Sequence, residues 1–217
     1  MTSSPYERDL GEGIQSHSQP TGSAGLKYPI ELHFRLLTLG QRISAVDAGG
    51  HTLMFIKQKM FKLKEKVEIY SDDSLARLMF RIEADRMLDF SANYHFTDAA
   101  GNDWGSVRRQ GMRSLWSAHY DVIQDGQIDM TIREENPTKK VLESILGEIP
   151  IIGLIAIYLL NPSYLICRPD GMPLLRLTKQ AAIFEGRFTL EKLHDMPEDD
   201  ELRSLIALIM VVLLERR

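Results

Sequence analysis

The sequence contains a single cysteine, Cys167, among its 217 residues. One thiol excludes a framework of internal disulfides and fits a protein kept in a reducing compartment, so we expect a cytoplasmic location. Positive charge is not in excess either, because 26 lysines and arginines stand against 30 aspartates and glutamates, a formal net charge of −4. The chain lacks the overall cationic field typical of nucleic-acid-binding proteins, and we expect no nucleic-acid partner.

Long apolar runs are also missing. The two longest, residues 149–160 and 205–214, fall short of the roughly 18 to 20 apolar residues that a membrane-spanning helix needs, so no transmembrane span is predicted. Residues 1–27 are rich in Ser, Gly, Pro and Gln without an apolar segment, which predicts a disordered leader rather than a targeting signal. Residues 28–217 have a size that a single β-barrel domain often reaches.

The motifs of common enzyme classes are absent as well. The sequence has no Gly-x-Ser-x-Gly, no His-Glu-x-x-His, no phosphate-binding loop and no paired cysteines. His95 and His119 fall on predicted strands, and a hydrolase would require both to line one cleft with an acid, whereas a structural role is the commoner one for such histidines. We therefore expect a protein that is not an enzyme, with no cofactor and no metal.

Turn signals recur along the middle of the chain. They are Asp47–Gly50, Asp98–Asn102, Asp125–Gly126 and Asp170–Gly171. Such residues supply the positive φ angles that tight hairpins require. Segments such as 78–84 and 127–133 alternate apolar and polar residues, the pattern of a strand with one buried face. Hairpins in series predict an antiparallel meander, which forms either a sandwich or a closed barrel.

The C-terminal segment is helical in pattern. Pro197 and the acidic residues 198–201 suit a helix N-terminus, and residues 205–214 are apolar around the whole circumference. A helix of this kind must be enclosed on every side. Its ten apolar residues span about 15 Å, roughly half the apolar core of a bilayer, so enclosure by protein is expected. Together with the strands, this predicts a mainly β protein in which a closed antiparallel barrel surrounds a central hydrophobic helix.

A second, amphipathic helix is predicted near residues 137–147. Asn136 and Pro137 suit the N-cap and the first helical residue, and Gly147 stands where helices often end. The apolar segment 149–160 follows it. We interpret this segment as a plug in one mouth of the barrel, with insertion into a membrane interface or contact with a partner as the alternatives.

Several stretches resemble the LURP-one-related family over residues 28–217. They are the run Phe55–Tyr70, the segment Ala76–Phe80, the turn Arg168–Gly171, and the acidic run Glu198–Glu201 that leads into the apolar helix. The resemblance implies a barrel of about twelve strands around a central helix, as in the tubby C-terminal domain and the phospholipid scramblases. Tubby domains bind phosphoinositides through basic residues, but none of those ligands can be matched to a residue of this chain.

Two basic clusters are the candidate ligand-binding residues. The first comprises Lys57, Lys59, Lys62, Lys64 and Lys66, and the second comprises Arg108, Arg109 and Arg113. Each outward cation would contribute about 1 kcal/mol towards an anionic membrane surface. The alternative interpretation is an ordinary solvated surface that Glu65 and Glu68 partly neutralise.

These observations predict a non-enzymatic barrel that binds anionic phospholipid headgroups or a protein partner at its surface, peripheral to a membrane in the first case. The alternative is a membrane-active protein similar to the scramblases.

Overall fold

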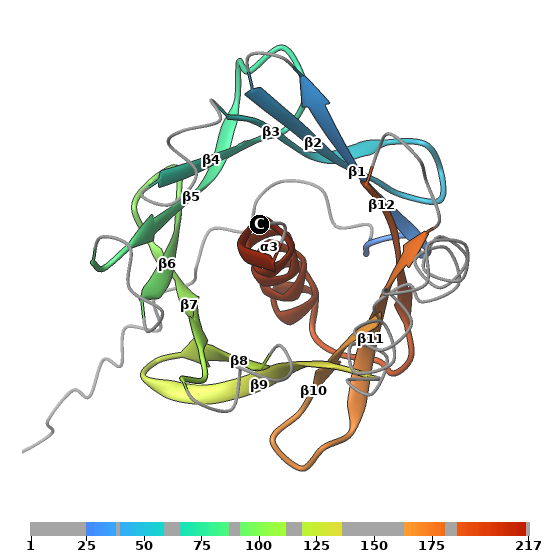
Figure 1. Cartoon of the computed structure of the whole chain (residues 1–217). Coiled ribbons are helices and arrows are strands. Elements are labelled where there is room, and N and C mark those ends of the chain that lie inside the picture. The colour runs from blue at the N-terminus through green and yellow to red at the C-terminus, as the bar shows by residue number, and fades with distance from the viewer. Residues whose placement is uncertain are drawn as a thin grey trace, which may run out of the picture.

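Twelve antiparallel strands close into a barrel, and the described residues contain one helix (Figure 1). The computed structural model describes residues 25–37, 40–58, 66–86, 92–111, 119–135, 163–180 and 186–215. Each strand pairs with the next one along the chain, and β1 pairs with β12 to complete the ring. The predicted mainly β, closed antiparallel barrel is confirmed, and so is the number of strands.

The strands are short and regularly spaced. The first six are β1 (Ile30–Leu37), β2 (Gly40–Val46), β3 (Thr52–Gln58), β4 (Lys66–Tyr70), β5 (Leu78–Ala84) and β6 (Asn93–Asp98). The second six are β7 (Asp103–Arg109), β8 (His119–Gln124), β9 (Gln127–Glu134), β10 (Ser163–Cys167), β11 (Pro173–Gln180) and β12 (Gly186–Lys192). The helix is α3 (Glu198–Glu215).

Hairpin turns occur where the Asp and Gly residues predict them. Between β8 and β9, φ is positive at both Asp125 (49°) and Gly126 (75°), the geometry that the tightest two-residue hairpins require. In the β2–β3 and β6–β7 turns, the carboxylates of Asp47 and Asp98 accept hydrogen bonds from the backbone N–H two residues later. These local bonds fix each loop and therefore the register of the strands that it joins.

Strand β1 lies outside the turn-based pattern and closes the barrel. Ile30, Leu32 and Phe34 are at most 1% exposed and belong to the core, while Glu31 and Arg35 between them are exposed. Its pairing with β12 joins the first and the last strand of the barrel. Such a contact depends on strands more than 150 residues apart in sequence, as the pair formed by residues 30 and 190 shows.

The helix α3 is buried over most of its length. Its residues 205–212 are each at most 2% exposed, and Figure 1 shows the helix inside the ring of strands. Its ends are bonded to strands on different sides of the ring, since Tyr120 of β8 donates to Glu215 (2.6 Å) and Lys192 of β12 donates to Glu201 (2.7 Å). Eight consecutive buried residues cover every side of a helix, so this segment has no solvent-facing stripe.

Gly105 allows β7 to lie close to β8. Its φ is +93°, and a Cβ at this position would collide with the backbone oxygen of Ile123. A side chain is therefore excluded by both conformation and space.

Three predicted features lie outside the described residues: the amphipathic helix near 137–147, the apolar segment 149–160, and the part of the leader that precedes residue 25. They remain predictions. The chain is already attached to the barrel at Lys27, whose backbone oxygen accepts a hydrogen bond from Ala48 (3.0 Å).

Candidate anion-binding surface

The predicted lysine cluster is described only at its two ends. Lys57 is exposed on β3, and Lys66 is exposed on β4. The Nζ of Lys66 lies 3.5 Å from carboxylate oxygens of both Glu68 and Glu83, so two acids on the same face neutralise its charge. Lys59, Lys62 and Lys64 lie outside the described residues. Of the described pair, Lys57 is the stronger candidate for an anionic ligand.

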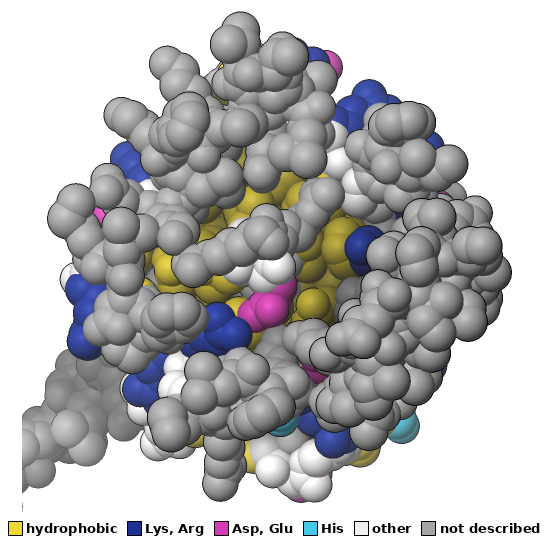
Figure 2. All heavy atoms as spheres, viewed as in Figure 1, with side chains coloured by type: hydrophobic (Ala, Val, Ile, Leu, Met, Phe, Trp, Pro, Cys, Tyr) yellow, Lys and Arg dark blue, Asp and Glu magenta, His cyan; other side chains and the backbone are white. Residues whose placement is uncertain are grey.

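The predicted arginine cluster is engaged with the protein's own carboxylates. Arg108 approaches Asp121 (3.3 Å), and Arg109 approaches Glu215 at the end of α3 (3.4 Å). Figure 2 shows an acidic side chain beside a basic one among hydrophobic side chains near the centre of this face. Arg113 lies outside the described residues. As consecutive residues of β7, Arg108 and Arg109 point to opposite faces of the strand, and each is paired with an acid.

A row of three cations, of which only Lys57 belongs to a cluster predicted from sequence, crosses three neighbouring strands. The register pairs Arg35 of β1 with Arg42 of β2, and Arg42 with Lys57 of β3. All three are exposed on the outer face of the barrel. Neighbouring strands lie about 4.8 Å apart, so the row is about 10 Å wide at the backbone. We call Arg35, Arg42 and Lys57 the cationic row.

The cationic row borders a hollow of about 310 Å³. Its lining residues are His33, Arg35, Arg42, Ser44, Val46, Phe55 and Asp73. His33 and Ser44 are paired across β1 and β2, and Ser44 is paired with Phe55 of β3. The hollow therefore combines two guanidinium groups, a hydroxyl and an aromatic ring, with Asp73 as the single acid in its lining.

Like charges on neighbouring strands make this row unfavourable for the fold itself. Directly opposed cations repel one another, whereas cross-strand pairs that favour folding each contribute roughly 0.2–1 kcal/mol. The side chains of Arg42 and Lys57 form no ion pair or hydrogen bond with any described residue. The hollow's donors can satisfy the oxygens of a phosphate or carboxylate, because a guanidinium offers two parallel N–H groups to such an anion.

His33 lies at the edge of this surface. Its Nε2 is 3.2 Å from a carboxylate oxygen of Glu31, and its side chain is 21% exposed. Its Nδ1 is buried and has no hydrogen-bond partner among the residues that the structure describes. The sequence does indicate that His33 and Arg35 point outward, because every second residue of 30–35 is polar. No turn motif marks this strand, however, so sequence reasoning did not select them.

The two candidate catalytic histidines are not brought together. His95 of β6 is paired with Ser106 of β7, which is paired with Ile123 of β8. His119 lies four residues from Ile123 along β8, or about 13 Å at strand spacing, and two strands away from β6. Within the described ranges, no group of three His, Cys, Asp or Glu residues is placed to hold a metal ion.

The fold defines a class of protein: a closed antiparallel β-barrel with a buried C-terminal helix. The model of the LURP-one-related family matches residues 52–146, which confirms the predicted resemblance over that range. Among solved structures, the X-ray structure of a protein from Arabidopsis thaliana is similar, with 14% sequence identity and a TM-score of 0.46. That similarity covers 88% of this chain and 93% of the other. No curated protein matches the chain.

Within the described residues, no helix has the length and apolar character that crossing a bilayer requires. The relation to tubby domains and to scramblases remains a prediction.

Proposed function

We propose that the protein is a non-enzymatic barrel of the LURP-one-related kind that binds anionic phospholipid headgroups through the cationic row and the hollow beside it. The observation that carries the proposal is the register that sets Arg35, Arg42 and Lys57 side by side. We further infer that α3 acts as the central support that holds these strands in a closed ring.

The contrast with the other basic residues supports this assignment. Lys66, Arg108 and Arg109 each lie within 3.5 Å of a carboxylate oxygen of the protein itself. A headgroup would have to compete with those carboxylates. Arg42 and Lys57 have no such competitor among the described residues, so their charge is directed towards a ligand.

The expected contribution of this surface is moderate. Each cation close to an anionic membrane contributes about 1 kcal/mol, so Arg42 and Lys57 together account for roughly a 30-fold change in the partition coefficient. The interaction weakens with salt, because the Debye length falls to about 8 Å at physiological ionic strength.

Vesicle co-sedimentation tests the proposal. Vesicles of phosphatidylcholine alone are compared with vesicles that also contain phosphatidylglycerol or a phosphoinositide. We expect salt-sensitive binding to the anionic vesicles, reduced roughly 30-fold in the double variant Arg42→Gln and Lys57→Gln. The matched control is Lys66→Gln, which removes an exposed lysine that is already paired with two acids and should change binding little.

The remaining outcomes each reject part of the proposal. A triple variant of Lys59, Lys62 and Lys64 that loses more binding than the double variant would move the site to the cluster predicted from sequence. Equal binding by the double variant and Lys66→Gln would reject the cationic row. No binding to any anionic vesicle would remove the lipid function and leave a protein partner. Lipid exchange in a dithionite assay would instead favour scramblase-like activity.

A further inference from the structure

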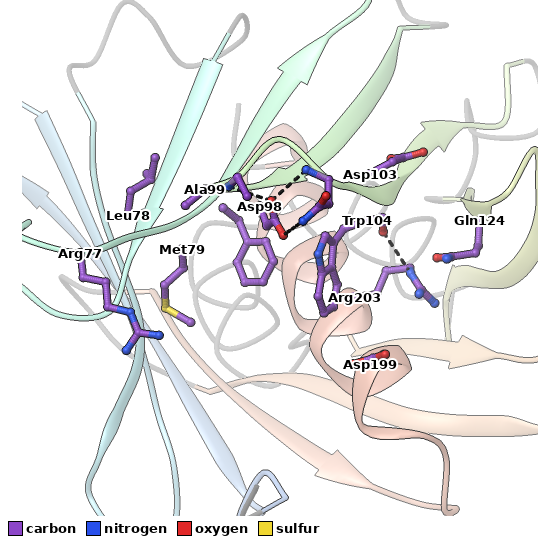
Figure 3. Close-up of a pocket in the computed structure, with 13 residues that line it drawn as sticks. Arg77, Leu78, Met79, Asp98, Ala99, Asp103, Trp104, Gln124, Asp199 and Arg203 are labelled. Carbon is purple, nitrogen blue, oxygen red and sulfur yellow. Dashed lines mark hydrogen bonds between the residues drawn. The ribbon is translucent and has the colours of Figure 1, made fainter. Parts of the chain in front are cut away.

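A second hollow, of about 320 Å³, opens at the N-terminal end of α3. Residues of β5, the β6–β7 turn, β7, the end of β8 and the first turns of α3 line it (Figure 3). This volume lies at the lower end of the roughly 300–1,000 Å³ typical of small-ligand sites. The hollow therefore suits one side chain or a small ligand rather than an extended segment. We call it the α3 pocket.

One wall of the α3 pocket is aromatic. Phe80 and Trp104 meet edge to face, with ring centroids 5.1 Å apart. Burial raises the pKa of Asp98, but hydrogen bonds from Asn102, Ala100 and the Trp104 indole outweigh that effect and lower the pKa overall. Asp98 is therefore ionised at neutral pH, and the partly exposed Trp104 lies beside it in the wall of the pocket.

The charges around the α3 pocket are mostly negative. The charged lining residues are Asp98, Asp103, Asp199, Arg77 and Arg203. Arg203 is already bonded to two further acids, Asp129 (3.1 Å) and Asp200 (2.7 Å). Five aspartates thus stand against two arginines, a formal net charge of −3. Asp103 and Asp199 are exposed. Asp103 already accepts a hydrogen bond from the Gly105 N–H (2.9 Å), so Asp199 is the acid more available to a ligand.

Two further features bear on the charge of the ligand that the α3 pocket favours. The N-terminus of a helix carries a partial positive charge of about half a unit, which alone would favour an anion. Here four acidic residues, 198–201, occupy the first turn and outweigh it. The buried side-chain oxygen of Gln124 also lines the α3 pocket and has no hydrogen-bond donor among the described residues. This oxygen is a hydrogen-bond acceptor, so it favours a ligand that can donate a hydrogen bond.

We propose that the α3 pocket binds the cationic side chain of an arginine or lysine in a basic segment of a partner protein. The cation lies over the ring of Trp104, the ring type that attracts cations most strongly, and donates to Asp199. In Figure 3 Arg77 lies on the opposite side of the opening from Asp199. Its positive charge weakens the binding of a cationic ligand, but its side chain does not occupy the position beside Asp199. This site and the cationic row use different residues, so neither proposal depends on the other.

Binding of short peptides tests the proposal on the full chain. A capped glycine-arginine-glycine peptide is compared with the same peptide carrying citrulline, a neutral side chain of nearly the same shape, and with one carrying glutamate. The Trp104 indole signal, assigned in the proton–nitrogen NMR spectrum by its loss in Trp104→Leu, reports binding. We expect the arginine peptide alone to shift this signal, and free methylguanidinium to bind more weakly because it lacks the peptide's backbone.

Charge variants give the decisive comparison. Asp199→Asn should weaken arginine binding roughly fivefold, the scale of one exposed ionic or cation–π contact, and Arg77→Gln should strengthen it. Glu191→Gln is the matched control, because it makes the same chemical change at an exposed residue of β12, a strand that does not line the α3 pocket.

Three results would overturn the proposal. Equal binding of the citrulline and arginine peptides would show that the α3 pocket recognises shape without charge. Preference for glutamate, together with weaker binding in Arg77→Gln, would make it an anion site. The absence of any shift with the arginine peptide at millimolar concentration would remove the site. The variant Arg42→Gln should leave peptide binding unchanged, which separates this site from the surface proposed for lipids.

Discussion

Replacing Arg203 with methionine tests how the N-terminal half of α3 is attached to the barrel. The Nε of Arg203 donates to the backbone oxygen of Trp104 on β7 (3.0 Å), and one terminal nitrogen donates to Asp129 on β9 and to Asp200 on α3. The side chain is only 6% exposed. Methionine fills much of the same length but offers no donor, so two carboxylates are left facing each other without a countercharge.

The structure sets the size of the expected loss. Removing one partner of a fully buried ion pair costs about 3–5 kcal/mol. Asp129 and Asp200 are 35% and 29% exposed, so water screens part of the repulsion, and we expect about 3 kcal/mol. For a domain of this size that corresponds to a fall in the melting temperature of about 6–12 °C.

The loss should also depend on pH. Burial raises the pKa of Asp129, the neighbouring Asp200 raises it further, and Arg203 acts in the opposite direction. Removing Arg203 therefore moves the folded-state pKa of Asp129 further above its unfolded value. A group with a raised folded-state pKa favours folding below the unfolded pKa and loses that contribution as pH rises through the folded one. The deficit of the variant should be largest at neutral pH and shrink near pH 4, about the unfolded pKa of an aspartate.

Urea unfolding followed by far-UV circular dichroism measures this free energy at both pH values. Adding Asp129→Asn to the variant should restore part of the stability at neutral pH, because it removes one of the two facing charges. A deficit below about 1 kcal/mol, the range of an ordinary surface ion pair, would refute the reasoning, as would a deficit that is equal at the two pH values.

Three other changes test the core, the β7–β8 contact and the start of the helix. Leu208→Ala removes a fully buried side chain of α3 and should cost about 3–4 kcal/mol in urea unfolding. Gly105→Ala should destabilise the barrel by at least about 3 kcal/mol, since a Cβ there collides with the backbone of Ile123 while φ is positive; wild-type stability would mean that β7 can shift away from β8. Hydrogen bonds to Glu201 and Asp195 raise the pKa of Lys192, so its stabilising effect is complete below its ordinary pKa and is lost as pH rises through the raised value. Lys192→Met should therefore abolish that alkaline loss of stability, while an unchanged alkaline unfolding curve would contradict the role given to this lysine.

Local signals in the sequence were sufficient for the hairpins and for the buried helix. A turn such as Asp125-Gly126 depends on the φ angles of two residues, which their own chemistry decides. Residues 205–212 are apolar on every side, so burial follows whatever encloses them. Both properties belong to a few consecutive residues and can be inferred without knowing the neighbours.

The choice of ligand-binding residues depended on the tertiary structure. Lys57 and Lys66 belong to one run in the sequence, yet Lys57 is part of the cationic row and Lys66 is paired with two acids. Arg35 and Arg42 belong to no cluster in the sequence, and only the pairing of β1 with β2 makes them neighbours. The register between strands, and with it the partner of every outward charge, is a relation between distant segments, and no single segment contains the information that sets it.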